Sequence, residues 1–143
     1  MDNDMFADFL SDEENEDSKD LDELVESYLE SKGISAFNAI EVVGNDIDSY
    51  VELVDIFVSV TPERINDMKE FITSGDMLNY SVLAHSTKSD ALLVGAEKLS
   101  ELAKGHELEA KQDNITYVKE NWDSLIEEWE RVLSIYEEFM AQM

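Results

Sequence analysis

The chain has 143 residues, with 35 acidic and 10 basic side chains and a formal net charge of −25. This length suits one domain with a sizeable core, and the negative charge argues against nucleic acid and anionic membrane surfaces as partners. The absence of cysteine excludes disulfides, thiolate nucleophiles and Cys-based metal sites. No apolar run is long enough to span a membrane and the first residues lack a basic signal region, so we predict a cytoplasmic protein.

A single proline and many helix-forming residues predict an all-α fold. Residues 1–17 are dominated by Asp, Glu and Asn and are expected to form an acidic, disordered tail. Within the tail, Met5, Phe6, Phe9 and Leu10 are spaced to share one face of a short helix, which leaves open a helix docked on the domain or a partner-binding peptide. Residues 18–143 are expected to form the folded domain.

Apolar side chains spaced three and four residues apart predict a series of helices. The first covers residues 18–31 and ends at Gly33, which is typical of the left-handed residue after a helix. A short helix over residues 34–43 follows, with Ser35 as its expected cap. These two form the N-terminal part of the predicted domain.

A long helix is expected to begin at Asp46 or Asp48 and to end near residue 73. Pro62 lies inside this segment and lacks the N–H group that a helix interior requires. We therefore expect either a kink at Pro62 or a split, with Thr61 capping a new helix in the second case.

Helices over residues 76–94 and 96–111 come next, separated by Gly95. A single last helix is expected to begin at Asp113 or Asn114 and to run to about residue 140, with two core tryptophans, Trp122 and Trp129. Four substantial helices joined by short turns predict an up-and-down antiparallel four-helix bundle with one or two additional N-terminal helices.

The helix over residues 76–94 divides into two faces when successive residues are placed 100° apart. One face is a stripe expected in the core: Tyr80, Leu83, Ala84, Thr87, Ala91 and Val94. The opposite face is mixed: Leu78, Ser81, His85, Lys88, Ser89 and Leu92. His85 is therefore expected to point to solvent, where a neutral imidazole is a nucleophile. Helical phase alone does not distinguish this role from that of an ordinary surface histidine.

The residues around His85 form the pattern A-H-x-x-K-x-x-A-x-x-x-G-A-x-x-L-x-x-L-A. It is spelled by Ala84, His85, Lys88, Ala91, Gly95, Ala96, Leu99, Leu102 and Ala103. This pattern resembles the histidine phosphotransfer (HPt) domain of bacterial two-component phosphorelays. The likeness extends over roughly residues 33–139 and includes the upstream segment 50–57 and the turn at 74–76. It implies that residues 18–143 form an HPt-like helical bundle.

The resemblance implies that His85 accepts a phosphoryl group from the aspartate of a response-regulator receiver domain and donates it back, with a histidine kinase or hybrid kinase upstream. Lys88 is expected to offset the phosphoryl charge. Partner docking is expected at Leu78, Ser81, Ser89 and Leu92. Because the receiver supplies the acidic pocket and the metal, the chain is expected to be a phosphocarrier and not an enzyme, with no cofactor or metal of its own.

Two positions depart from the family pattern, which usually has Gly where this chain has Ser89 and Leu where it has Thr87. Asp90 is expected to oppose a phosphoryl group weakly. Two further readings stay open: a non-phosphorylated binding module that docks on and inhibits a receiver domain or histidine kinase, and a purely structural acidic bundle. The second histidine, His106, lies in a polar stretch and is expected at the surface.

Overall fold

A computed structural model describes residues 18–142, and the predicted tail over residues 1–17 lies outside the described residues. Within the described range every regular element is a helix, which confirms the all-α prediction. The helices are α2 (Ser18–Ser31), α3 (Ala36–Val42), α4 (Ile47–Ser74), α5 (Met77–Leu93), α6 (Glu97–Lys111), α7 (Ile115–Glu120) and α8 (Trp122–Ala141). None of these helices is long and apolar enough to cross a membrane.

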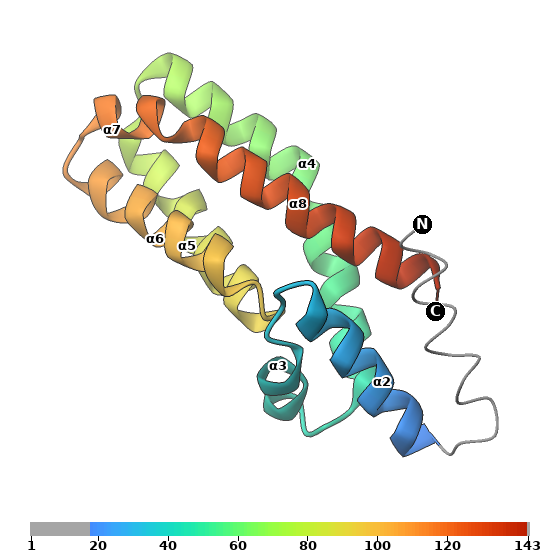
Figure 1. The fold of residues 1–143 in the computed structure, drawn as a ribbon. Helices are drawn as coiled ribbons and strands as arrows, with labels where there is room; N and C mark the ends of the chain where they lie inside the picture. Colours follow the sequence, from blue (N-terminus) through green and yellow to red (C-terminus); the bar gives the residue numbers. More distant parts are fainter. Residues whose placement is uncertain (1–17, 143) are drawn as a thin grey trace.

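The long helices form an antiparallel bundle in which α5 packs along α6, while α4 contacts both α5 and α8. Figure 1 shows α4 beside α8 and α5 beside α6, with α2 and α3 together at one end of the bundle. The predicted four-helix bundle with additional N-terminal helices is thus confirmed. The chain reverses direction at short turns, so the bundle follows the order of the sequence.

Side-chain caps and a glycine set the ends of the long helices, and the cap at Asp46 is one of the two that the sequence predicts for the start of the long helix. Asp46 begins α4 by accepting a hydrogen bond from the Asp48 amide at 3.2 Å, and Asp76 begins α5 by accepting one from the Asn79 amide at 3.1 Å. Gly75 closes α4 with a φ of 74°, a left-handed conformation that glycine adopts readily. Ser35 occupies the N-cap position of α3, as predicted, but its side chain makes no capping hydrogen bond.

Helix α4 runs through Pro62 as one helix, so the predicted split does not occur. Thr61 is not a cap: its hydroxyl donates to the Phe57 carbonyl at 2.8 Å and accepts from Trp129 Nε1 at 3.2 Å. The Thr61 side chain is buried and joins α4 to α8. Packing on both sides of the proline therefore holds the helix together despite the missing N–H group.

The last predicted helix is two helices, because the chain breaks at Asn121 between α7 and α8. Asn114 begins α7 by accepting a hydrogen bond from the Tyr117 amide at 3.2 Å. Asn121 Nδ2 donates to the Tyr117 carbonyl at 2.9 Å, and the Asn121 carbonyl accepts from His106 Nε2 at 3.1 Å. Asparagine competes with helical backbone bonds in this way, which accounts for the break that periodicity alone did not predict.

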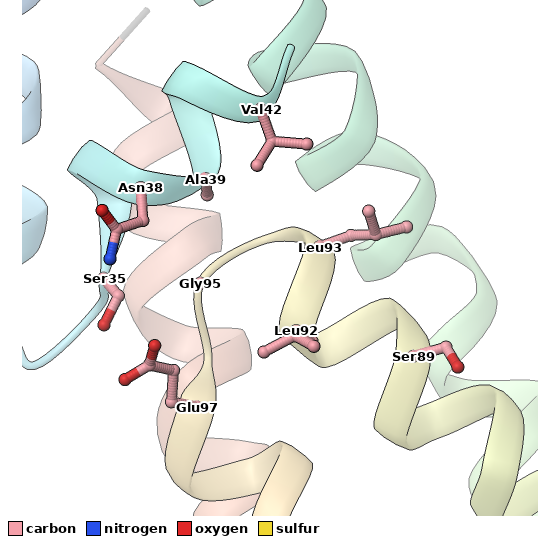
Figure 2. Close-up of a pocket in the computed structure, with 9 residues that line it drawn as sticks. All are labelled: Ser35, Asn38, Ala39, Val42, Ser89, Leu92, Leu93, Gly95 and Glu97. Carbon is pink, nitrogen blue, oxygen red and sulfur yellow. The ribbon is translucent and has the colours of Figure 1, made fainter.

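The turn between α5 and α6 holds α3 against the end of α5 (Figure 2). The Ser35 amide donates to the Gly95 carbonyl at 2.8 Å. Gly95 has a φ of 88°, and a Cβ atom built there would lie 2.7 Å from the Ser35 carbonyl oxygen. Only glycine allows this approach, which places α3 beside the helix that carries His85.

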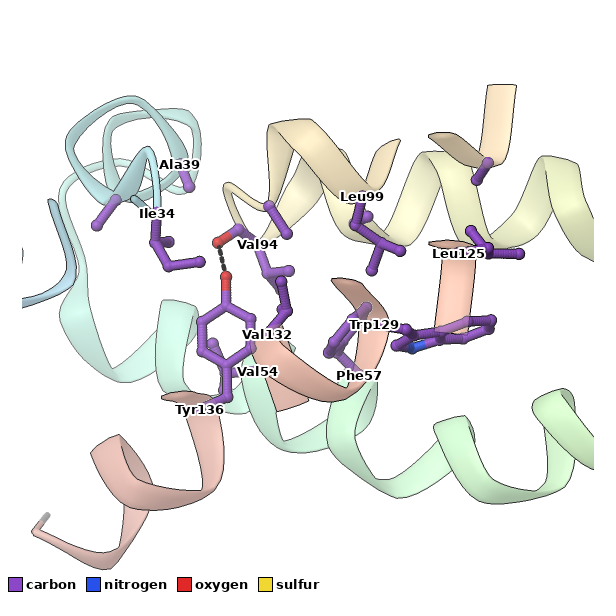
Figure 3. Packing of buried hydrophobic residues seen from close by; sticks show 14 of the residues in the cluster. Ile34, Ala39, Val54, Phe57, Val94, Leu99, Leu125, Trp129, Val132 and Tyr136 are labelled. Carbon is purple, nitrogen blue, oxygen red and sulfur yellow. Dashed lines mark hydrogen bonds between the residues drawn. The ribbon is translucent and has the colours of Figure 1, made fainter. Parts of the chain in front are cut away.

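The core lies between α4, α8 and the α5–α6 pair, and it confirms Trp129 as a core residue (Figure 3). The half-buried Trp122 packs against its edge. Two buried tyrosines, Tyr50 from α4 and Tyr136 from α8, both donate hydrogen bonds to the carbonyl of Val94, just after α5. The last carbonyls of a helix lack partners within the helix, so the two hydroxyls satisfy one of these groups inside the core.

Candidate functional site

His85 lies near the middle of α5, and 58% of its side chain is exposed. The residues predicted on the opposite face are buried, apart from the half-buried Leu83. Thr87, where the family pattern has Leu, is also fully buried, and its hydroxyl donates to the Leu83 carbonyl at 2.8 Å. The helical phase predicted for α5 is therefore confirmed, and the polar atom of Thr87 is satisfied within the helix.

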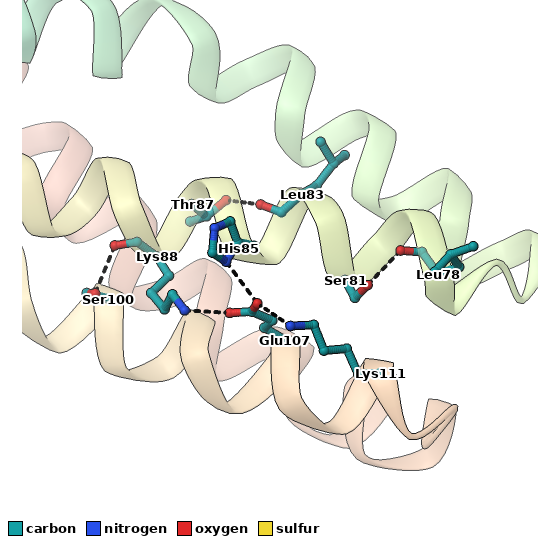
Figure 4. Close-up of polar contacts among 9 residues, drawn as sticks. All are labelled: Leu78, Ser81, Leu83, His85, Thr87, Lys88, Ser100, Glu107 and Lys111. Carbon is teal, nitrogen blue, oxygen red and sulfur yellow. Dashed lines mark hydrogen bonds and ion pairs between the residues drawn. The ribbon is translucent and has the colours of Figure 1, made fainter.

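A carboxylate from the neighbouring helix holds the imidazole ring of His85 (Figure 4). His85 Nδ1 lies 2.9 Å from Oε2 of Glu107 on α6, and only 3% of the Glu107 side chain is exposed. An ionised carboxylate can only accept, so Nδ1 carries a proton and donates it to this hydrogen bond. The lone pair of the neutral ring then lies on Nε2, which makes Nε2 the nucleophilic atom.

Two lysines complete the group around Glu107 (Figure 4). Lys88 Nζ lies 2.8 Å from Oε1, and Lys111 Nζ lies 2.9 Å from Oε2. Burial by itself would raise the pKa of the Glu107 carboxyl, but contacts from Lys88, Lys111 and His85 outweigh it and lower this pKa to about 2. Glu107 is therefore ionised at neutral pH and acts as a fixed acceptor for the His85 ring.

The face around His85 carries most of the side chains predicted to dock a partner. Leu78 and Leu92 are 76% and 58% exposed, and Ser89 is exposed between them. Val82 also lies on this exposed surface and was not among the predicted residues. The outward-facing residues form a largely apolar strip on both sides of the imidazole.

Ser81 was expected on the same exposed face, and that expectation is wrong. Its side chain is buried, and its hydroxyl donates to the Leu78 carbonyl at 2.6 Å (Figure 4). Helix α6 packs along the flank of α5 and covers positions at the edge of the exposed face. Ser81 therefore stabilises the helix and is not available for contact with a partner.

Asp90 was expected to oppose a phosphoryl group on His85. The Asp90 carboxylate instead forms an ion pair with Arg64 on α4, with Nη1 and Oδ2 2.8 Å apart. A paired carboxylate repels a nearby anion less than a free one. The contact also joins α4 to α5, so the main effect of Asp90 is structural.

His106, expected at the surface, is buried and only 2% exposed. Its Nε2 atom donates to the Asn121 carbonyl at 3.1 Å, so Nδ1 is the acceptor for the Tyr80 hydroxyl at 2.8 Å. Burial lowers the pKa of His106, although the bond to the Asn121 carbonyl opposes this shift. His106 is thus a neutral structural histidine that connects α5, α6 and the break before α8.

Glu107 and Lys111 were not found by sequence reasoning, although the sequence carried a signal for Glu107. The buried stripe of α6 includes Leu99, Ala103 and Ala110, and Glu107 falls in the same register. A charged residue on an apolar stripe requires a compensating partner, because an unpaired buried charge is costly. Lys111 follows four residues later, one helical turn away, where a cation can provide that partner.

Among residues 23–142, whose side chains the structure describes, no group of three or more His, Cys, Asp or Glu side chains is arranged to hold a metal ion. The polar group at His85 is instead one carboxylate surrounded by nitrogen donors. Such a group holds and orients an imidazole ring.

Fold and site together define a helical-bundle domain that presents one nucleophilic histidine to solvent. The chain belongs to the Hpt domain family, whose model matches residues 52–135. No curated protein and no solved structure matches the chain. Hpt domains are phosphocarriers of two-component phosphorelays, not enzymes, and they work with receiver domains and kinases. The matched residues extend from α4 into α8, so α2 and α3 precede them.

Proposed function

We propose that this chain is a histidine phosphotransfer protein in which His85 Nε2 carries the phosphoryl group. The observation that supports this role most directly is the hydrogen bond between His85 Nδ1 and the buried Glu107 carboxylate. It fixes the ring in one orientation, with Nε2 as the free nitrogen, while 58% of the side chain stays exposed. A receiver domain can therefore reach the nucleophile without any rearrangement of the bundle.

Transfer consists of one displacement at phosphorus. Nε2 of His85 attacks the aspartyl phosphate of the receiver, the P–N bond forms, and the P–O bond to the aspartate breaks. The aspartate leaves as a carboxylate, and the imidazole ring gains positive charge while Nδ1 keeps its proton. The Glu107 carboxylate, 2.9 Å from Nδ1, stabilises that charge. The reverse sequence returns the phosphoryl group to the receiver.

Lys88 is the residue of this chain that balances the charge of the phosphoryl group. It lies three residues after His85, about one turn along α5, and 29% of its side chain is exposed. An ammonium group acts as a point charge that adapts to different phosphate orientations. The receiver supplies the acidic pocket and the divalent metal, and the rate depends mainly on in-line placement of the reacting atoms.

Partner docking is assigned to the exposed strip of α5 around His85, which includes Leu78, Val82, Ser89 and Leu92. At the end of α5 this strip continues into a pocket of about 530 Å³ between α5 and α3 (Figure 2). Both Ser89 and Leu92 line the pocket, together with Ala39 and Val42 of α3. An apolar side chain of a docked receiver fits this pocket while the receiver aspartate approaches Nε2.

The test uses a receiver domain that carries a radiolabelled aspartyl phosphate. We expect acid-labile label on the wild-type chain and none on His85→Gln. A useful control is Lys104→Met, because Lys104 is exposed on α6 and this change leaves the site intact. Equal labelling of the wild type and His85→Gln would exclude His85 as the carrier.

A second candidate function is a non-phosphorylated binding module that docks on a receiver domain or a histidine kinase and inhibits it. The observation in its favour is Ser89, whose exposed side chain occupies a docking position where the family usually has Gly. This reading predicts that Ser89→Trp abolishes regulation while His85→Gln preserves it. The phosphocarrier reading predicts that both variants lose function.

A further inference from the structure

Glu107 is shared by three nitrogen groups, and its two oxygens are not equivalent. Oε2 lies 2.9 Å from both His85 Nδ1 and Lys111 Nζ, whereas Oε1 lies 2.8 Å from Lys88 Nζ. Among the described residues, Oε1 is held by the ion pair with Lys88 and by no other donor. Oε2, by contrast, keeps two nitrogen partners, His85 and Lys111, if Lys88 turns toward another anion.

The two lysines differ in their place relative to the histidine. Lys88 is on α5, in the same helix as His85, whereas Lys111 is on α6, four residues after Glu107. A phosphoryl group on Nε2 would add two negative charges close to Lys88. The carboxylate and the phosphoryl group would then compete for the same ammonium group.

We propose that Lys111 is a positioning residue for phosphoryl transfer, because it keeps Glu107 paired when Lys88 moves from Oε1 to the phosphoryl group. This inference rests on the proposed role of His85. The Glu107 side chain is only 3% exposed, and a buried carboxylate without a cation is strongly unfavourable. Without Lys111, Lys88 stays bound to Glu107 and the phosphoryl group lacks its counter-ion.

The proposal makes the effect of Lys111 depend on Lys88, which a double-mutant cycle measures directly. Transfer from one phosphorylated receiver is compared for the wild type, Lys88→Met, Lys111→Met and the double variant at saturating receiver. We expect Lys111→Met to slow transfer about fivefold or more, within the range of coupled neighbours. The double variant should be no slower than Lys88→Met alone.

Three further measurements separate positioning from a general structural effect. The receiver concentration that gives half the maximal rate should not change in Lys111→Met, since docking uses the α5 strip. Lys111→Arg should restore the rate, because a guanidinium group also pairs with a carboxylate. Lys104→Met, which removes an exposed lysine from the same helix, should transfer like the wild type.

Each outcome supports or overturns the inference. The inference is overturned if the rate losses of the two single variants multiply in the double variant, or if Lys111→Met transfers as fast as Lys104→Met. It is also overturned if Lys111→Met changes only the receiver concentration that gives half the maximal rate. Because 57% of the Lys111 side chain is exposed, the variant is expected to fold, and Lys111→Gln provides a second substitution. A labelled wild type with an unaffected Lys111→Met rejects this inference alone, whereas an unlabelled wild type rejects the proposed function and the inference together.

Discussion

Nδ1 of His85 lies 2.9 Å from Oε2 of Glu107, and this contact joins an exposed ring on α5 to a buried charge on α6. Replacing Glu107 with Gln keeps the shape and an acceptor oxygen but removes the charge. The amide stabilises the positive charge on the reacting ring less, so we expect transfer to slow about tenfold or more. Single-turnover transfer from a phosphorylated receiver measures this effect.

The matched control for this change is Glu101→Gln, which alters an exposed glutamate on the same helix. It should leave the transfer rate unchanged. Nitrogen NMR of the His85 imidazole provides an independent readout of the hydrogen bond to Glu107, because the neutral ring of the wild type should carry its proton on Nδ1. A wild-type rate in Glu107→Gln would show that the carboxylate charge has no part in transfer.

Stability should fall as the solution becomes acidic, for two reasons that act in different pH windows. The pKa of His106 is lowered from 6.5 in the folded chain, so the unfolded chain binds more protons and stability decreases as pH falls below 6.5. The Glu107 pKa is lowered from 4.5 to about 2, so its contribution is complete above 4.5 and is lost as pH falls toward 2. Urea denaturation at a series of pH values measures both windows.

His106→Gln separates the two contributions. It removes the titrating ring, so the slope of unfolding free energy against pH should become flatter just below pH 6.5, while the loss below pH 4.5 stays. Glu107→Gln should show the reverse pattern. An unchanged slope below pH 6.5 in His106→Gln would mean that the buried histidine does not control this part of the acid response.

Sequence reasoning worked where the property is local. The helical period of α5 depends only on residues close in the chain, so it correctly placed Ala84 and Ala91 in the core and His85 toward solvent. The cap at Asp46, one of two predicted alternatives, is local for the same reason, since its side chain bonds an amide two residues away.

Sequence reasoning failed where contacts with other helices determine whether a side chain is buried and which partners it has. Ser81 lies at the edge of the exposed face, and only the position of α6 decides that it is buried. His106 lies seven residues after Leu99, in the buried stripe of α6, so its polar neighbours were a poor guide to its burial; the partners that satisfy its ring, Tyr80 and Asn121, come from other elements. Such partners, distant in the chain, are not specified by hydrophobic periodicity.

The two tyrosines on the Val94 carbonyl should show coupled effects on stability. Tyr50 and Tyr136 both donate to this oxygen, so Tyr136→Phe removes one of two bonds and should cost about 1 kcal/mol. With both tyrosines changed to Phe, the buried carbonyl has no hydroxyl partner. The double variant should therefore lose more stability than the sum of the two single variants, because an unsatisfied buried group carries an extra penalty. Urea denaturation of the three variants tests this, and strict additivity would contradict the shared-acceptor arrangement.

Gly95 should be the more sensitive of two glycines that adopt left-handed backbone. Both Gly95 and Gly44 have positive φ values, 88° and 74°, so alanine strains the backbone at either position. At Gly44 a Cβ meets nothing within 4 Å, whereas at Gly95 it lies 2.7 Å from the Ser35 carbonyl oxygen. We expect Gly44→Ala to cost about 1 kcal/mol and Gly95→Ala to cost roughly 1–3 kcal/mol more. Thermal or urea unfolding of the two variants gives this difference directly.

Because the clash would also push α3 away from α5, Gly95→Ala should weaken receiver binding at the pocket lined by Ala39 and Leu92, while Gly44→Ala should not. Equal losses of stability in the two variants would show that the contact with Ser35 does not hold α3 in place.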